Sequence, residues 1–194
     1  MKSLLLTLIL FPTFLFSQIV PKELKKEIPK ELTFKYDKFE QIAWIGSGYQ
    51  PLGSSLENPN SKLDAELYFG ISKDGNLTPL RIKFRYAGND WIFSEEIIFL
   101  CAPAKQIRND EAEPIRVQLE KNPNNDVLSG GYINEHFDMI VNDDMLQVIN
   151  YYVNGGQFTA TKLKGDEGSI QLATFGKKIS KTFKSLYEYY INKS

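Results

Sequence analysis

The chain has 194 residues, with 23 lysines and arginines against 24 aspartates and glutamates, a formal net charge of −1 and one cysteine, Cys101. This near-neutral balance disfavours nucleic-acid binding, because such a binder usually carries a clear basic excess. One cysteine cannot form an intramolecular disulfide, so core packing alone must hold an exported chain together. Cys101 closes an apolar run, and we expect a buried structural thiol there.

The first segment has the three parts of a secretory signal peptide. Lys2 is basic, residues 4–11 are apolar, and a small residue precedes an expected cleavage after Ser17 or Gln18. A transmembrane anchor is the alternative, but Pro12 interrupts an apolar run shorter than the ~20 residues that a span needs. No cysteine lies directly after this run, since Cys101 is the one cysteine of the chain, so we expect no lipoprotein anchor on cysteine. We expect residues 1–18 to be a signal peptide and the product to be a secreted or periplasmic bacterial protein, with no membrane span after signal removal.

Residues 19–38 are dense in lysine and glutamate. The tetrapeptide Pro-Lys-Glu-Leu occurs twice, beginning at Pro21 and at Pro29. The segment is either a solvated spacer or a short helix that stops before Pro29, because proline is tolerated in a first helical turn but not inside a helix. Residues 39–194 are then expected to form a single β-rich domain, which a chain of this length can fold around one core.

A first strand is predicted at residues 39–45, followed by a long loop rich in glycine, proline and asparagine up to residue 60. The glycines lack the lysine and serine or threonine that a phosphate-binding loop requires. Long loops inside a compact domain are often functional. Trp44 and Tyr49 are therefore marked as a possible ligand rim.

Residues 63–71 and 80–86 alternate between apolar and polar side chains, which predicts strands with one buried face. With Gly88 and Asn89 as a tight turn, a hairpin would place Tyr86 opposite Trp91 and Phe84 opposite Phe93. That register points Glu95 inward, so a β-bulge near residues 94–96, or a longer loop with a shifted register, is predicted to turn it outward. The result is a three-stranded meander over residues 63–100.

Strands are further predicted at residues 115–119, 132–141, 157–163 and 169–173, with a helix after the acidic residues Asp143 and Asp144. A C-terminal helix is predicted from apolar residues at helical spacing, capped by Thr174. These elements predict an α+β fold: a mainly antiparallel sheet of about seven or eight strands, as a sandwich or open barrel, covered by two helices, one of them C-terminal.

One strand face has chemical potential. Tyr132, Asn134, His136 and Asp138 alternate with apolar residues and so share a face. His136 and Asp138 could form an acid/base pair or supply two metal ligands. However, the chain has no second histidine, and no serine lies in a recognisable nucleophile motif. A solvated outer face of a sheet explains the pattern with fewer assumptions.

We therefore expect an exported binding or interaction module without catalytic activity, with no cofactor and no metal. Its partner is an unknown protein or small-molecule ligand, bound at very weakly marked positions: Tyr132, Asn134, His136, Asp138, Trp44 and Tyr49. One alternative is a hydrolase using His136 and Asp138, and another is a structural accessory of the cell envelope with residues 19–38 as spacer.

Overall fold

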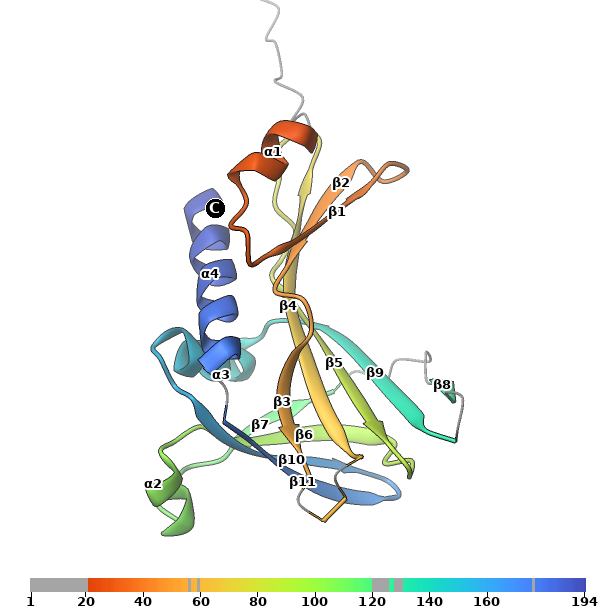
Figure 1. The fold of residues 1–194 in the computed structure, drawn as a ribbon, viewed down its shortest axis with the longest axis vertical. Coiled ribbons are helices and arrows are strands. Elements are labelled where there is room, and N and C mark those ends of the chain that lie inside the picture. Colours follow the sequence, from red (N-terminus) through yellow and green to blue (C-terminus); the bar gives the residue numbers. More distant parts are fainter. Residues whose placement is uncertain (1–20, 56, 59, 120–125, 128–130, 176) are drawn as a thin grey trace, which may run out of the picture.

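A computed structural model describes residues 21–55, 57–58, 60–119, 126–127, 131–175 and 177–194. In these residues the chain forms one mainly antiparallel sheet with four helices, a β-rich single domain of the α+β class (Figure 1). The predicted fold class is confirmed, although the described sheet has eleven strands rather than seven or eight. The predicted signal peptide at residues 1–18 lies outside the described residues.

The strands follow the order β7-β6-β10-β11-β3-β4-β5-β9-β8, with β2 also paired to β4 and β1 paired to β2. All eleven described strands are hydrogen-bonded into one sheet, rather than into two separate sheets. Their bounds are β1 Thr33–Asp37, β2 Ile42–Gly46, β3 Gln50–Ser54, β4 Lys62–Ser72, β5 Arg81–Gly88, β6 Ser94–Leu100, β7 Ile115–Gln118, β8 Asp126–Val127, β9 Ile133–Ile140, β10 Phe158–Gly165 and β11 Gly168–Phe175.

Residues 21–37 pack against the domain. For this segment the sequence predicted either a solvated spacer or a short helix. Helix α1 (Pro21–Glu27) is followed by strand β1, and the apolar residues Leu24, Ile28 and Leu32 are buried in the core. Leu24 lies in α1, whereas Ile28 and Leu32 lie in the segment between α1 and β1, and the lysines and glutamates between them are exposed. Glu27 also accepts a hydrogen bond from Lys193 Nζ at 2.9 Å, which joins α1 to the C-terminal helix.

The predicted hairpin between β4 and β5 forms, but the predicted hairpin between β5 and β6 does not. Strand β5 pairs with β4 and β9, whereas β6 pairs with β10 and β7. Tyr86 therefore lies opposite Leu63 and Glu135 rather than Trp91, and Phe84 lies opposite Ala65 and Phe137 rather than Phe93. The physical reason is the connection: Phe93 adopts a φ of 49°, and the chain leaves β5 for the other half of the sheet instead of turning back.

The predicted bulge at residues 94–96 is confirmed, with a different partner strand. Ser94 lies opposite Gly165 and Glu96 opposite the preceding residue, Lys164, so Glu95 is the extra residue in β6. The bulge leaves Glu95 exposed and points Ile97 and Phe99 into the core, where neither is accessible to solvent.

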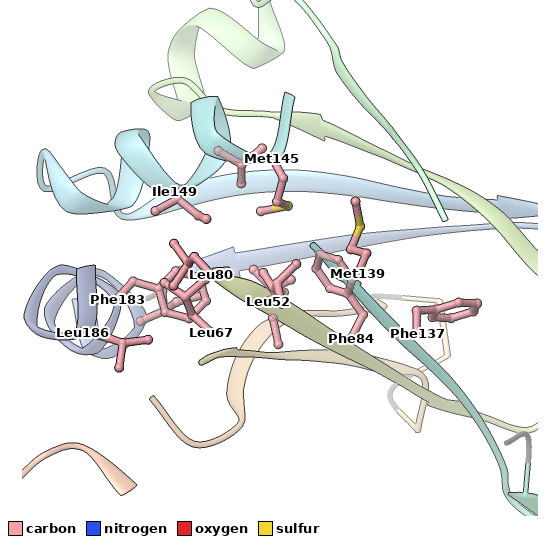
Figure 2. Packing of buried hydrophobic residues seen from close by; sticks show 14 of the residues in the cluster. Leu52, Leu67, Leu80, Phe84, Phe137, Met139, Met145, Ile149, Phe183 and Leu186 are labelled. Carbon is pink, nitrogen blue, oxygen red and sulfur yellow. The ribbon is translucent and has the colours of Figure 1, made fainter. Parts of the chain in front are cut away.

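The core lies between the bent sheet and the helices α3 (Asp143–Val153) and α4 (Lys177–Lys193). Figure 2 shows its labelled side chains as a band that runs from Leu186 and Phe183 on α4 to Met139 and Phe137 on β9. Asn142 caps α3 by accepting a hydrogen bond from the Met145 N–H at 2.9 Å, as the acidic start predicted. Helix α4 begins at Lys177, so Thr174 belongs to β11 and is not its cap.

Helix α1 corresponds to the short helix that was left open as an alternative to a spacer, whereas the five-residue α2 (Ala104–Arg108) was not predicted. Helix α2 lies beside β10 on the outer side of the sheet (Figure 1). Within the described part of the chain, no helix is long and apolar enough to cross a membrane.

Candidate functional site

The sequence-predicted polar face exists on β9 and continues across β5 and β4. His136 and Asp138 are half-buried on its outer side, with Phe137 and Met139 buried on the inner side. Asn134 is only 7% exposed, and Tyr132 precedes the strand at 37% exposure. Alternation along the strand thus placed the outer residues as predicted, although Asn134 is not solvated.

Asp138 is the centre of a side-chain network on this face. The Tyr68 hydroxyl donates its one hydrogen to this carboxylate and lies 2.8 and 2.7 Å from the two Asp138 oxygens, and Arg81 Nε donates to Oδ1 at 3.1 Å. Arg81 Nε also donates to the Tyr68 oxygen at 3.0 Å. Burial, and then the hydrogen bond to Asp138, raises the pKa of Tyr68 far above its ordinary value, so the phenol stays protonated and donates.

Cations cover the aromatic rings beside this network. Lys83 Nζ lies 4.3 Å from the ring centre of Tyr68, and Arg85 Cζ lies 4.6 Å from that of Tyr49. Arg85 also pairs with Asp64 at 2.6 Å. Trp44, predicted as part of a ligand rim, instead packs against Tyr68 with 5.7 Å between ring centres. Most charged groups and aromatic rings of this face therefore already have a partner within the face.

A hollow of about 530 Å³ on this face, which we call the outer-face hollow, brings together three of the predicted residues: Tyr49, His136 and Asp138. Lys83 and Asp126 also line it, whereas Tyr132, Asn134 and Trp44 do not. Among the described residues no hydrogen bond joins His136 to Asp138, whose oxygens serve Tyr68 and Arg81. Burial lowers the pKa of His136, and Asp126 opposes this effect. The geometry gives no oriented acid/base pair.

Glu135, on the inner face of the same strand, was missed by the sequence analysis. It is fully buried, and its carboxylate accepts hydrogen bonds from the backbone N–H groups of Ile92, Phe93 and Ser94 at 2.6, 2.8 and 2.9 Å. The Ser94 hydroxyl donates a fourth bond at 2.7 Å. An acidic residue at an inward position of an alternating strand was the available signal, because a buried charge requires dedicated partners.

A second concave surface lies on the outer side of β6, β10 and β11, and we call it the apolar cavity. Its volume is about 460 Å³. Ala160 and Ala173 lie opposite each other on β10 and β11, and Leu100 lies opposite Ala160 on β6. Because both alanine side chains are small, they leave open space above the sheet at these adjacent positions. The half-buried residues Ile98 and Leu100 line the same space.

Helix α2 covers the apolar cavity only in part. None of its residues is buried, and Ile107 is its one side chain that lines the cavity. A helix of five residues presents too little apolar surface to close over the strands beneath it. Lys162, Glu57 and Asp110 also line the cavity, so that it carries charged groups of both signs.

The sequence held one signal for this cavity. Residues 97–100 of β6 are apolar at every position, a pattern that is typical of a strand covered on both faces. Ile97 and Phe99 face the core, so Ile98 and Leu100 require cover on the other side, which α2 provides only in part.

Cys101 and the acidic residues give no reactive centre in the described structure. Burial raises the pKa of the Cys101 thiol to about 12, so it stays protonated and unreactive. In the described ranges, no three His, Cys, Asp or Glu side chains are grouped so that they could hold a metal ion.

Comparisons of this chain with protein-family models, with curated proteins and with solved structures found no match.

Proposed function

We propose that this protein is an exported, non-enzymatic binding module that takes up a small, largely apolar ligand in the apolar cavity. The observation that carries the proposal is the cavity itself: about 460 Å³ of space over Ala160 and Ala173. Ligand sites typically measure about 300–1,000 Å³ and are lined mostly by apolar side chains with a few polar groups.

The driving force would be the hydrophobic effect. Ile98, Leu100 and Ile107 remain half-exposed in the free protein because α2 covers them incompletely. A ligand that removes their apolar surface from water gains about 25 cal/mol for each Å² that it covers. Because the cavity is already formed, little ordering energy opposes binding.

A binding role without chemistry fits the lining residues. Ser55 lines the cavity, but its hydroxyl oxygen accepts the backbone N–H of Asn58 at 3.2 Å. The one histidine of the chain lies elsewhere, in the outer-face hollow. Thr161 also lines the cavity, and its buried hydroxyl has no hydrogen-bond partner, so no hydrogen bond among the described residues joins a serine or threonine hydroxyl of the cavity lining to a general base. Export is part of the proposal because of the leader-like residues 1–18.

The test is a titration of the purified protein with N-phenyl-1-naphthylamine, a neutral apolar probe whose fluorescence rises when it leaves water. We expect saturable binding with one site. The variant Ala160→Phe fills the cavity floor from an outward-facing position, and we expect probe affinity to fall by roughly tenfold, or about 1.4 kcal/mol. The midpoint of urea unfolding serves as the check that Ala160→Phe is folded.

A matched pair of variants separates the cavity from unspecific adsorption. Ile98→Asp places a carboxylate in the cavity, and Ile140→Asp places one at an exposed β9 position outside it. Only Ile98→Asp is expected to weaken probe binding. Equal binding by both variants and the parent protein, or no saturable binding at all, would overturn the proposed function.

A further inference from the structure

We propose that the ligand is an amphipathic cation, whose apolar body occupies the apolar cavity and whose ammonium group occupies a second hollow that adjoins it. This inference rests on the proposed function, because it assigns the chemical class of the ligand of the same site. It is carried by two adjoining concave surfaces that share three lining residues and by the charge of the second one.

The second surface, which we call the acidic hollow, has a volume of about 560 Å³. It shares the lining residues Ser55, Glu57 and Gln171 with the apolar cavity, so the two hollows adjoin each other. On β11, Ala173 lines the cavity and Ser169, four residues away, lines the hollow. At about 3.3 Å per strand residue, the combined groove extends over about 13 Å of this strand.

On the β10–β11 hairpin, the groove is lined by residues 160–162 of β10, by residues 168–173 of β11 and by Glu167 in the turn. Helix α2 lies beside one end, and the β10–β11 turn lies at the other (Figure 1). That turn is fixed to the connection between β5 and β6, because Glu167 N–H donates to the Ile92 carbonyl at 3.3 Å. The wall of the acidic hollow is therefore built from two loops that are bonded to each other.

The charge of the acidic hollow is of one sign. Asp90, Glu167 and Glu57 line it, and its described lining contains no lysine, arginine or histidine. The ion pairs formed among the described residues involve none of the three carboxylates. A cation placed here meets uncompensated negative charge, and an anion meets repulsion.

An aromatic ring adds to the same preference. Trp91 lines the acidic hollow and stacks on Phe93, with 5.4 Å between ring centres. Tryptophan is the best aromatic partner for an ammonium group. The loop that carries it is held in place by the four hydrogen bonds to Glu135, so the ring is positioned before a ligand arrives.

The apolar cavity does not reverse this preference. Lys162 and Asp110, which line the cavity but not the acidic hollow, carry opposite charges and offset each other. The charge selectivity of the groove is therefore set at its acidic end, while its other end selects for apolar surface.

The experiment compares three ligands with one apolar body and different head groups: 6-phenylhexylamine, 6-phenylhexan-1-ol and 6-phenylhexanoate. Each displaces N-phenyl-1-naphthylamine from the purified protein at pH 7 and low salt. We expect the amine to bind about tenfold more tightly than the alcohol, from two or more carboxylates and one ring, and the carboxylate to bind most weakly. Near 1 M salt, where the screening length is about 3 Å, the advantage of the amine should shrink.

The variants locate the effect. In the double variant Asp90→Asn with Glu167→Gln, the amine should lose its advantage while the affinity for the alcohol stays unchanged. Asp74→Asn, which neutralises an exposed carboxylate in the β4–β5 turn outside the groove, is the matched control and should keep the parent preference.

The outcomes separate this inference from the proposed function. If the probe and the alcohol bind but the amine has no advantage, or if its advantage survives the double variant, the inference is overturned and the apolar site stands. If neither the probe nor any of the three ligands binds, both proposals fail. An amine preference that depends on Asp90 and Glu167 supports both.

Discussion

The two faces of strand β9 hold carboxylates three residues apart that differ in almost every physical respect. Glu135 on the inner face is fully buried and accepts its four hydrogen bonds from three backbone N–H groups and one hydroxyl. Asp138 on the outer face keeps 25% of its side chain exposed and accepts from the side chains of Tyr68 and Arg81. Water can replace the partners of Asp138, whereas nothing replaces those of Glu135.

This difference shows how one strand serves two purposes. The inner carboxylate closes the connection between β5 and β6, since its donors are the residues at which the chain crosses to the other half of the sheet. Consecutive backbone N–H groups that converge on one anion form a fixed binding nest, here filled by a side chain of the protein itself. The outer carboxylate belongs to a surface network, in which losses are partly compensated by solvent.

The largest effect is expected from Glu135→Ala. The substitution leaves three backbone N–H groups, of which those of Ile92 and Ser94 are buried, and one buried hydroxyl without an acceptor, and we expect the unfolding free energy to fall by about 3–5 kcal/mol. Urea unfolding followed by tryptophan fluorescence measures the loss. Trp91 adjoins the released loop, so the preference for 6-phenylhexylamine should also weaken.

The control for Glu135→Ala is Glu40→Ala, which removes a glutamate of the same size from an exposed turn. We expect it to change the unfolding free energy by no more than about 0.5 kcal/mol. If both alanine variants are equally stable, the carboxylate of Glu135 does not hold the β5–β6 connection, and the comparison between the two faces fails.

A smaller effect is expected from Asp138→Ala, of about 1–2 kcal/mol, because Tyr68 and Arg81 lose a charged acceptor at a partly hydrated site. Tyr68→Phe removes the hydroxyl that donates to Asp138 and accepts from Arg81, and we expect a loss of about 0.5–1.5 kcal/mol because the partners stay partly hydrated. The loss of the double variant should be smaller than the sum of the two single-variant losses, since both single variants remove the hydrogen bonding between Tyr68 and Asp138. Strict additivity, measured in the same urea experiment, would show that the pair at 2.7 Å contributes nothing of its own.

The sequence predicted local structure well because local periodicity determines it. Alternation identified β4, β5 and β9, and helical spacing after Asn142 identified α3. It also placed His136 and Asp138 on one face. The partner of β5 depended instead on contacts between residues far apart in the chain, among them Glu135 with Ile92, which no local pattern encodes.

The candidate binding groove was less predictable than the strands. Ala160 and Ala173 are ordinary strand residues, and only the register between β10 and β11 makes them adjacent. Likewise, Asp90 and Glu167 come from two different loops, which meet because the β10–β11 turn bonds to Ile92. The site is assembled from four strands and four connections, so the apolar run at residues 97–100 indicates only that part of β6 needs cover and does not reveal the rest of the site.

The smallest effect is expected from His136→Ala. His136 is half-buried in the outer-face hollow, and the described residues provide it with no hydrogen bond, so the unfolding free energy should change by less than about 0.5 kcal/mol at pH 7.5. Binding of N-phenyl-1-naphthylamine should be unchanged, because His136 does not line the groove. A hydrolytic activity of the parent protein that disappears in His136→Ala would instead favour the alternative of a hydrolase.

The same variant has a pH signature that tests the environment of His136. Burial lowers the pKa of this imidazole in the folded protein below its ordinary value of 6.5, so the unfolded chain binds the proton first as the pH falls. The contribution of His136 is fully present above pH 6.5 and is lost on acidification through the window between 6.5 and the lower pKa of the folded state.

Glu66, whose pKa burial raises, is common to both proteins and cancels in their difference. The difference in unfolding free energy between the parent protein and His136→Ala should therefore shift in favour of the variant between pH 7.5 and pH 5.5. A shift in favour of the parent would mean that Asp126 outweighs burial and holds a protonated imidazole, which would place a stabilised cation in the outer-face hollow.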